Sequence, residues 1–566
     1  MLSKLNLIIV IFFVSAFLLF GSCKEKKHPR VVMVKKEIVK KPEEIDDQIT
    51  GNIKNELAFA AENNNKIDDS ITLNMRKVDS AFYEKNNYHN IWSKKETWQP
   101  WADSMFDFIK NCKYYGLYPS DYHFKELDTL RKKVAGDTLA HKDAVVWTKA
   151  DLMFTDAFMK TAKDLKEGRL VPDSVSIAFK PKYIDSFFLK NMDDIKYLSL
   201  TDFFNSIEPK SQRYQSLKMY AKEFIDTMHT KKFQHIDYPE DDTMKFISQL
   251  QTRLAQEGIK TNDDPLPDSL TLSDEIKEYE AMHKFKKDGK LNDRLIERLN
   301  NTDEERFKRI AITLDRCKML PDSMPQKYIW VNIPGYYLQL WDNDSVIINS
   351  KVIVGKPKTP TPTLFSRISD MVTYPQWTIP ESIIKKEILP GLKKDPTYLQ
   401  RKGYNLIDSK GQVVDATKIK WSRYKDAIPW KIMQGSGDDN ALGVFKFNFY
   451  NPYSVYLHDT NERYLFKNTK RALSHGCVRV QAWQELEHFI TANDSLNNTS
   501  GRPLSYNTDS INTWLANKQK KTIYVKNRLP LFIQYFTCDV KNNKLVFYDD
   551  IYNNDAALAE KYFANK

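Results

Sequence analysis

The chain has 566 residues, of which 41% are hydrophobic, 13% aromatic and 28% charged. This composition is typical of globular proteins and excludes collagen, wholesale disorder and a small disulfide scaffold, and the length predicts two to four domains. The net charge is +12, from 86 basic and 74 acidic residues. No basic stripe with interleaved aromatic residues occurs, so nucleic acid is not an expected partner, whereas an acidic cell-wall polymer is compatible with the charge.

The N-terminus has the pattern of an export signal. An apolar run from Leu5 to Phe20 is short for a membrane-spanning helix and suits the core of a signal peptide. Gly21 and Ser22 then precede Cys23, and small residues before a cysteine resemble a bacterial lipobox. We expect a lipoprotein signal peptide at residues 1–22 and a lipid on Cys23; an uncleaved membrane anchor is the alternative. Both interpretations place the rest of the chain outside the cytoplasm, as an exported, periplasm-facing, membrane-anchored protein.

The cysteines of the mature chain do not indicate a metal site. Cys112, Cys317, Cys477 and Cys538 are widely spaced, and no pair has the C-x-x-C spacing of zinc ligands. Neither a structural metal nor a disulfide framework is therefore expected.

Residues 23–70 are rich in Lys, Glu, Asn and Asp, which predicts a flexible tether. Helical stripes then favour a helical scaffold domain at 71–240; the second stripe, ended by Gly168, consists of Phe154, Phe158, Thr161 and Leu165. Apolar stripes at 241–300 predict a module of three short helices, with Ser273 as a possible cap of the second.

From residue 326 the pattern changes to strands and turns, starting with the β-type run 328–333. This predicts a mainly β domain at 326–530 and C-terminal strands and tail at 531–566. The fold class is therefore a multidomain α+β protein with helical modules before a β domain.

A specific catalytic pattern occurs in the β region. A strand-like run leads into His458, and the sequence Ser-His-Gly-Cys-Val-Arg follows at 474–479. A thiol attacks a carbonyl as the thiolate, and imidazole can supply that state. We expect Cys477 in a turn between sheet and helix, where a helix N-terminus favours a thiolate. His475 stands two residues from Cys477, so along an extended chain both side chains point the same way, whereas His458 suits a base on a neighbouring strand.

The residues around the thiol also suggest an oxyanion site. Gly476 allows close approach of a substrate and an unusual backbone angle, and the N–H groups of Gly476 and Cys477 are natural oxyanion donors. The alternative is a buried cysteine with two chance histidines.

The larger pattern resembles a known family. His458, fifteen intervening residues and then Ser-His-Gly-Cys-Val-Arg resemble the signature of L,D-transpeptidases with a YkuD-type catalytic domain. Segments 354–362, 440–443, 457–460 and 549–552 are similar to the same family. The resemblance is to its large periplasmic subfamily, which implies a helical scaffold domain, a peptidoglycan-binding-like module and a C-terminal catalytic domain. It also implies a capping subdomain inserted at 375–435.

The resemblance implies roles for individual residues. Cys477 is the implied nucleophile and His458 the implied proton donor and acceptor, held in the useful tautomer by a backbone carbonyl just after it. His475 and Gly476 would shape the oxyanion region. Three residues are assigned to substrate binding or its loop: Arg479, Ser474 and Asn440. For Arg479, structuring the loop and meeting a substrate carboxylate both remain open, and for Ser474 a loop hydrogen bond is favoured over catalysis.

The implied reaction is the formation of 3-3 peptidoglycan cross-links through a cysteine thioester with release of D-Ala, without a cofactor. Peptidoglycan stem peptides are the implied partners and carbapenem β-lactams the implied inhibitors. Hydrolysis of the thioester would instead give a carboxypeptidase or a cross-link hydrolase, and a non-catalytic lipoprotein that ties membrane to wall is a further alternative. In the 241–300 module, Phe285-Lys286 stands where the family has Phe-Gln, so a spacer is as compatible as glycan binding.

Overall fold

The computed structural model describes residues 36–170, 185–197, 199–229, 231–237, 242–261, 267–499 and 501–563. These residues form two compact units: one comprises most of the chain before residue 204, and the other comprises residues 204–563 together with 111–118 and 163–170. Within the described residues, no helix has the length and hydropathy needed to cross a membrane. The expected signal peptide and Cys23 lie outside the described residues.

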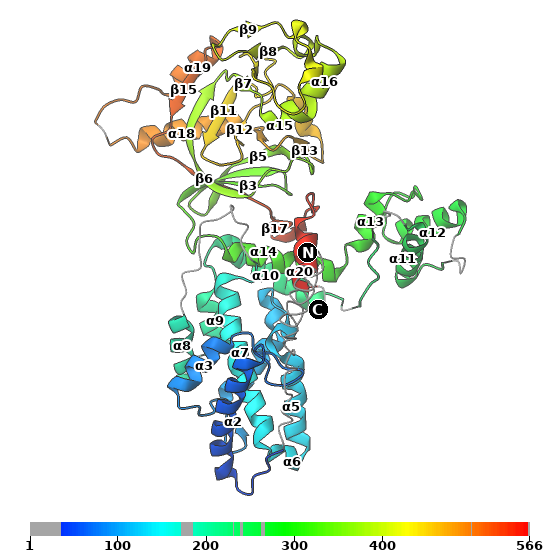
Figure 1. Ribbon diagram of the computed structural model, residues 1–566, viewed down its shortest axis with the longest axis vertical. Helices are drawn as coiled ribbons and strands as arrows, with labels where there is room; N and C mark the ends of the chain where they lie inside the picture. The colour runs from blue at the N-terminus through cyan, green and yellow to red at the C-terminus, as the bar shows by residue number, and fades with distance from the viewer. Residues whose placement is uncertain are drawn as a thin grey trace, which may run out of the picture. The chain divides into compact units, whose positions relative to one another are not determined.

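The first unit is helical, as the stripes predict (Figure 1). Phe154, Phe158 and Leu165 are fully buried on one long helix, and Gly168, just after its end, has the left-handed φ of +78°. The elements up to residue 207 are α2 (Pro42–Glu62), α3 (Arg76–Lys85), β1 (Ser93–Lys94), β2 (Thr97–Trp98), α4 (Pro100–Lys110), α5 (Phe124–Gly136), α6 (Thr138–His141), α7 (Ala144–Glu167), α8 (Asp185–Asp193) and α9 (Leu200–Ile207).

The expected tether at 23–70 is wrong for its second half. Helix α2 occupies residues 42–62, and its Ile45, Ile49 and Ile53 are buried. These side chains recur every four residues and form an apolar stripe, which the polar composition of the segment conceals. The described part of 23–70 is therefore folded with the scaffold.

Three short helices form a module of their own, as expected for 241–300. They are α11 (Thr243–Gln256), α12 (Ser269–Met282) and α13 (Asp293–Asn300), and they enclose a core that includes Leu250, Ile276 and Leu299. Ser273 does not cap α12, because the helix begins one turn earlier, where Asp268 accepts hydrogen bonds from the backbone of residues 270 and 271.

The second unit is built on a sheet that closes on itself. Its strands follow the order β11-β12-β14-β5-β4-β3-β16-β6-β15, and β11 also pairs with β6, while β13 pairs with β5. Helices α18 (Trp483–Leu496) and α19 (Thr508–Ala516) accompany it. The strands are β3 (Lys327–Asn332), β4 (Tyr337–Asp342), β5 (Ser345–Gly355), β6 (Leu364–Thr373), β11 (Phe445–Phe449), β12 (Leu457–His458), β13 (Ala472–Ser474), β14 (Val478–Val480), β15 (Lys521–Tyr524) and β16 (Pro530–Gln534).

Two of the expected domain boundaries fall inside this unit. Helix α10 (Gln212–Thr227) buries Tyr214 and Leu217 in one core with Trp330 of β3 and Phe532 of β16. The scaffold boundary at 240 and the catalytic boundary at 530 are therefore wrong. The same core contains residues of α14 (Asp303–Lys318) and β17 (Cys538–Lys541), which pairs with β18 (Lys544–Phe547). Apolar stripes alone cannot tell which partner a helix packs against.

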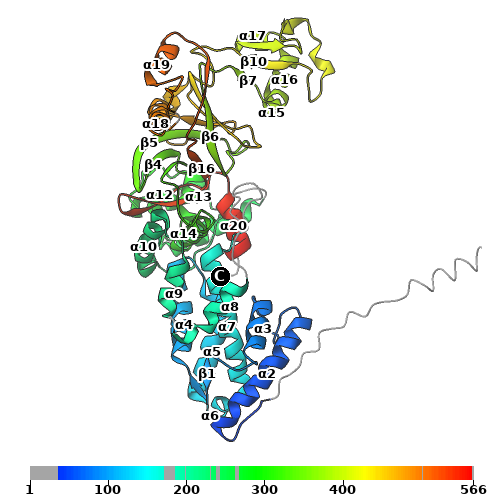
Figure 2. The same ribbon diagram turned by 90° about the vertical axis from the view of Figure 1, so that its left-hand side faces the viewer.

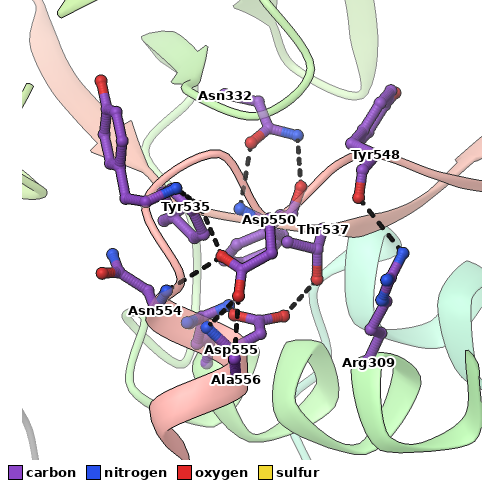
Figure 3. Close-up of polar contacts among 12 residues, drawn as sticks. Arg309, Asn332, Tyr535, Thr537, Tyr548, Asp550, Asn554, Asp555 and Ala556 are labelled. Atoms are coloured by element: carbon purple, nitrogen blue, oxygen red, sulfur yellow. Dashed lines mark hydrogen bonds and ion pairs between the residues drawn. The ribbon is translucent and has the colours of Figure 1, made fainter. Parts of the chain in front are cut away.

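The C-terminal segment is held to the sheet by a polar network (Figure 3). Tyr535 donates its hydroxyl to Asp550, whose carboxylate also accepts from the backbone at the start of α20 (Asn554–Phe563). Asn332 of β3 bonds both backbone groups of Phe536. The segment after residue 530 therefore belongs to the catalytic fold.

The insertion expected at 375–435 is a folded subdomain with its own core and a four-stranded sheet of order β7-β10-β8-β9 (Figure 2). Leu389, Trp421 and Ile432 lie in that core. Its elements are β7 (Trp377–Thr378), α15 (Glu381–Ile383), η4 (Ile384–Ile388), α16 (Leu389–Lys394), α17 (Tyr398–Arg401), β8 (Tyr404–Ile407), β9 (Val413–Val414) and β10 (Lys431–Gln434).

Candidate active site

Strand register brings the candidate residues to one face of the sheet. His458 on β12 is paired with Arg479 on β14 and with Lys446 on β11. Side chains of directly paired residues lie on the same face, and so do residues two apart along a strand. Tyr456 and Cys477, two positions before His458 and Arg479, therefore share this face. The intervening residues of β12 and β14 point to the apolar core.

Cys477 does not lie where the sequence predicts. It follows β13 and directly precedes β14, and α18 begins only at Trp483. The expected turn between sheet and helix is wrong because residues 478–480 pair with β12 and β5 as a strand. The chain offers other groups to a thiolate in place of a helix N-terminus.

Burial raises the pKa of the Cys477 thiol, and its neighbours oppose that shift. Tyr456, through its backbone and hydroxyl, and the cations Lys446 and Arg479 all favour the thiolate and lower the pKa. The thiol therefore stays protonated at rest and needs a base as it reacts.

The register places His458, the candidate base, on the same face of the sheet as the Cys477 thiol. Its side chain is buried, and burial together with nearby Arg479 and Lys446 lowers the pKa of the imidazole to about 3. Backbone groups of Asp459 and Leu442 lie near the ring and oppose this fall in pKa. The Nδ1 atom of His458 nevertheless makes no hydrogen bond with a described residue. The ring is thus neutral at ordinary pH and able to accept a proton.

A set of short hydrogen bonds shapes the loop before Cys477. Ser474 donates its hydroxyl to the carbonyl of Cys477 at 2.6 Å and accepts from the N–H of Gly476 at 3.1 Å. Thr361 donates to the carbonyl of Gly476 at 2.8 Å. Ser474 is therefore a loop residue, as favoured above, and its buried hydroxyl is not offered to a substrate.

The same bonds decide which backbone groups can serve as oxyanion donors. The N–H of Gly476 is taken by Ser474. The N–H of Cys477 makes no hydrogen bond within the described part of the chain. Of the two expected donors, Cys477 alone has its N–H available in this conformation.

His475 points to the inserted subdomain. Its Nε2 lies 2.5 Å from a carboxylate oxygen of Glu387 in η4. The stretch from His475 to Cys477 is not extended, since Gly476 has φ +115°, so the extended chain on which the expected common direction of both side chains depends does not occur. The contact instead links the nucleophile loop to the insertion.

Two residues expected at the substrate have partners within the protein. Arg479 donates to a carboxylate oxygen of Glu462 at 2.8 Å, which favours the loop-structuring role over a substrate contact. Asn440 is buried and uses both ends of its amide in a turn, donating to the carbonyl of Gly435 and accepting from the N–H of Leu442. The structure therefore gives Asn440 a role in the turn in place of the expected substrate contact.

Four residues of the site escape the sequence analysis. Lys446 and Tyr456 are brought to the thiol by strand register, while Glu387 and Trp377 come from the insertion, where Trp377 lies close enough to Tyr456 to lower the pKa of its hydroxyl against a larger rise from burial. Tyr456 could have been found from its position two residues before His458. Trp377 is one of the aromatic residues of the expected capping insertion, whereas Lys446 and Glu387 carry no signal in a single sequence.

Comparison with known proteins agrees with this architecture. Residues 326–496 match the family model of the L,D-transpeptidase catalytic domain, YkuD, and residues 80–220 match that of the Scaffold domain. The chain carries a YkuD-type L,D-transpeptidase catalytic domain. A Haemophilus influenzae protein named "Putative L,D-transpeptidase" is 34% identical over 250 residues, which cover 44% of this chain and 48% of that protein. The chain thus spans about half the length of this curated relative.

Solved structures of L,D-transpeptidases are also similar to part of this chain. One from Mycobacterium smegmatis is 12% identical, with a TM-score of 0.16, over 37% of this chain and 58% of its own. The structure titled "Ldtfm-avibactam carbamoyl enzyme" is 10% identical, with a TM-score of 0.16, over 50% and 87%. The assignment of the YkuD-type domain rests on the family models.

Proposed function

We propose that the protein is a cell-wall L,D-transpeptidase that forms 3-3 peptidoglycan cross-links through a thioester on Cys477. The observation that carries the proposal is that Cys477 and His458 share one face of the sheet, where the imidazole is buried and neutral. A protein that only ties membrane to wall has no use for this arrangement.

The reaction begins on a donor stem tetrapeptide. Cys477 attacks the carbonyl between the third residue and the terminal D-Ala while its proton passes to His458. His458 returns this proton to the amine of the departing D-Ala, and a thioester remains. The N–H of Cys477 stabilises the oxyanion. A side-chain amine of another stem then attacks the thioester carbonyl and gives its proton to His458. The C–S bond breaks, His458 returns the proton to the leaving sulfur of Cys477, and the new amide is the cross-link. Thiol, imidazole and backbone donors suffice, so no cofactor enters.

Incubation of purified disaccharide-tetrapeptide with the soluble protein tests this proposal. Mass spectrometry should find a dimer that lacks one D-Ala, and Cys477→Ala should form none while keeping its fold. Tripeptide as the sole product would instead identify a carboxypeptidase, and unchanged tetrapeptide a non-catalytic lipoprotein. Cleavage of a supplied 3-3 dimer would identify a cross-link hydrolase. His458→Ala should lose acylation as Cys477→Ala does.

The inserted subdomain is proposed to be a lid over the Cys477 groove. The contact of Glu387 with His475 and the approach of Trp377 to Tyr456 support this role. A lid excludes water from the thioester and so favours attack by an amine. Shortening 375–435 should raise the ratio of tripeptide to dimer. An unchanged ratio, with both products formed normally, would identify a rigid packing subdomain.

The location proposed for the protein is the periplasmic side of a membrane, held by a lipid on Cys23. The small residues before Cys23 support this proposal. Cys23→Ala, in a chain whose signal is still cleaved, should leave the membrane fraction. Retention of the cleaved variant in that fraction would contradict the lipid anchor.

A further inference from the structure

Lys446 is a cation at the candidate active site that makes no direct ion pair with the described residues. It lies on β11 directly opposite His458 and is only partly exposed. Its Nζ stands 3.9 Å from the centre of the Tyr456 ring, and it forms no ion pair with a carboxylate of the described residues. Burial lowers the pKa of the Lys446 ammonium group, and the negative charges of a Cys477 thiolate and of Asp370 oppose that fall, so an anion on Cys477 would stabilise the charged form of Lys446.

The other charged groups around the thiol already have partners. Arg479 is paired with Glu462. Asp370 of β6, the carboxylate that acts on Lys446, accepts hydrogen bonds from Asn448 and Ser369. Among the described residues of this face, Lys446 is therefore the cation that makes no direct ion pair.

We propose that Lys446 is the counter-charge of the Cys477 thiolate. This role rests on the proposed function of Cys477 as a nucleophile. His458 takes the proton from the thiol and becomes positive, but burial, together with the nearby cations Arg479 and Lys446, makes the imidazolium unfavourable and lowers the pKa of this ring. Lys446 lowers the cost of the negative sulfur without itself exchanging a proton. Cation–π attraction to the face of the Tyr456 ring holds the Lys446 ammonium group in this position.

The expected effect can be worked out from thiol chemistry. Removal of one cation near a thiol raises its pKa by about one unit, which lowers the thiolate fraction about tenfold at neutral pH. The intrinsic reactivity of a thiolate rises about threefold for each unit by which the pKa of its thiol rises, since the Brønsted coefficient is roughly 0.4–0.5. Alkylation of Cys477 in Lys446→Met should therefore be about threefold slower at neutral pH, with its half-maximal pH displaced upward by about one unit.

The test measures iodoacetamide alkylation of Cys477 from pH 6 to pH 10 in the full soluble chain, by peptide mass spectrometry. Lys446→Arg keeps the charge and should retain the wild-type profile. Lys521→Met is the matched control. Lys521 also lies on a strand with its ammonium group over an aromatic ring, that of Trp514, but its strand is β15, which pairs with β6. Lys446→Gln repeats the test if Lys446→Met does not fold.

Several results would overturn the proposal. One is an alkylation profile of Lys446→Met that equals that of the wild type. Another is a half-maximal pH that shifts as far in Lys446→Arg or in Lys521→Met as in Lys446→Met. An unchanged thiol profile with a raised KM for the tetrapeptide would assign Lys446 to a substrate carboxylate instead. Because alkylation needs no peptidoglycan, the displaced profile can be observed even if the protein forms no cross-links.

Discussion

The protonation state of His458 gives the sharpest test of the site. An ordinary histidine titrates near pH 6.5, whereas burial, with nearby Arg479 and Lys446, lowers the pKa of His458 to about 3. Below pH 6.5 the unfolded chain binds a proton at this position that the folded chain does not. The stability contributed by the neutral ring is therefore complete above pH 6.5 and is lost as the pH falls toward 3.

The size of this effect follows from the two pKa values. Integrating the proton linkage from pH 6.5 to pH 4.5 predicts that folding around His458 loses about 2 kcal/mol. His458→Gln removes the titration and keeps a polar side chain. The free energy of unfolding of the variant should therefore fall by about 2 kcal/mol less than that of the wild type over this interval.

Native-state hydrogen exchange of β11 and β12 amides in the full chain, at several urea concentrations, measures this free energy for the relevant unit. His283→Gln is the control, because it changes a more exposed histidine in the helical module. Equal pH dependence in His458→Gln and wild type would refute the buried, neutral imidazole. So would a His458 ring whose carbon NMR signal titrates with a midpoint above pH 5.

Three further outcomes are expected. Ser474→Ala should slow acylation without abolishing it and destabilise the loop by about 1–3 kcal/mol, because Gly476 loses an acceptor and Cys477 a donor; stopped-flow acylation and urea unfolding measure both effects. A carbapenem should add its mass to the wild type on Cys477, and an adduct on Cys477→Ala in an intact-mass spectrum would contradict the proposed nucleophile. Burial and the neighbouring Asp156 raise the pKa of Asp79 well above its usual range, so the folded scaffold holds this carboxyl protonated. Asp79→Asn should therefore raise the melting temperature of the scaffold at pH 7, and the gain should shrink toward pH 4; a lower melting temperature at pH 7 would contradict it.

Local patterns predicted the elements that depend on near neighbours in the chain. The stripe on α7 and the three-helix module follow from helical spacing, and the motif at 474–479 identified the candidate nucleophile. These signals are local because a helix repeats its buried face every three or four residues. The catalytic domain was predicted from the strand pattern after residue 326 and from several short segments that resemble one family, each of them a local signal.

Long-range pairing set the limits of the sequence analysis. Lys446 reaches the site only because β11 pairs with β12 in one register, and a shift by one residue would turn it to the other face. The same dependence explains the wrong domain boundaries at 240 and 530. Residues of α10 and β16 share one core, and an apolar stripe on a helix does not show which element covers it. It also explains the misplaced helix N-terminus at Cys477, where strand pairing continues the chain as β14.

In the proposed reaction, a neutral thiol and a neutral imidazole share one face of the sheet at rest, so charge separates only when a carbonyl arrives to be attacked. That chemistry treats water and an amine alike once the thioester exists, because neither Cys477 nor His458 distinguishes the two nucleophiles. The choice between cross-linking and hydrolysis must therefore be made by whatever controls access to the thioester. His475 and Glu387 link the loop that carries Cys477 to the inserted subdomain. This subdomain is therefore the part of the chain that can respond when an acceptor stem occupies the site.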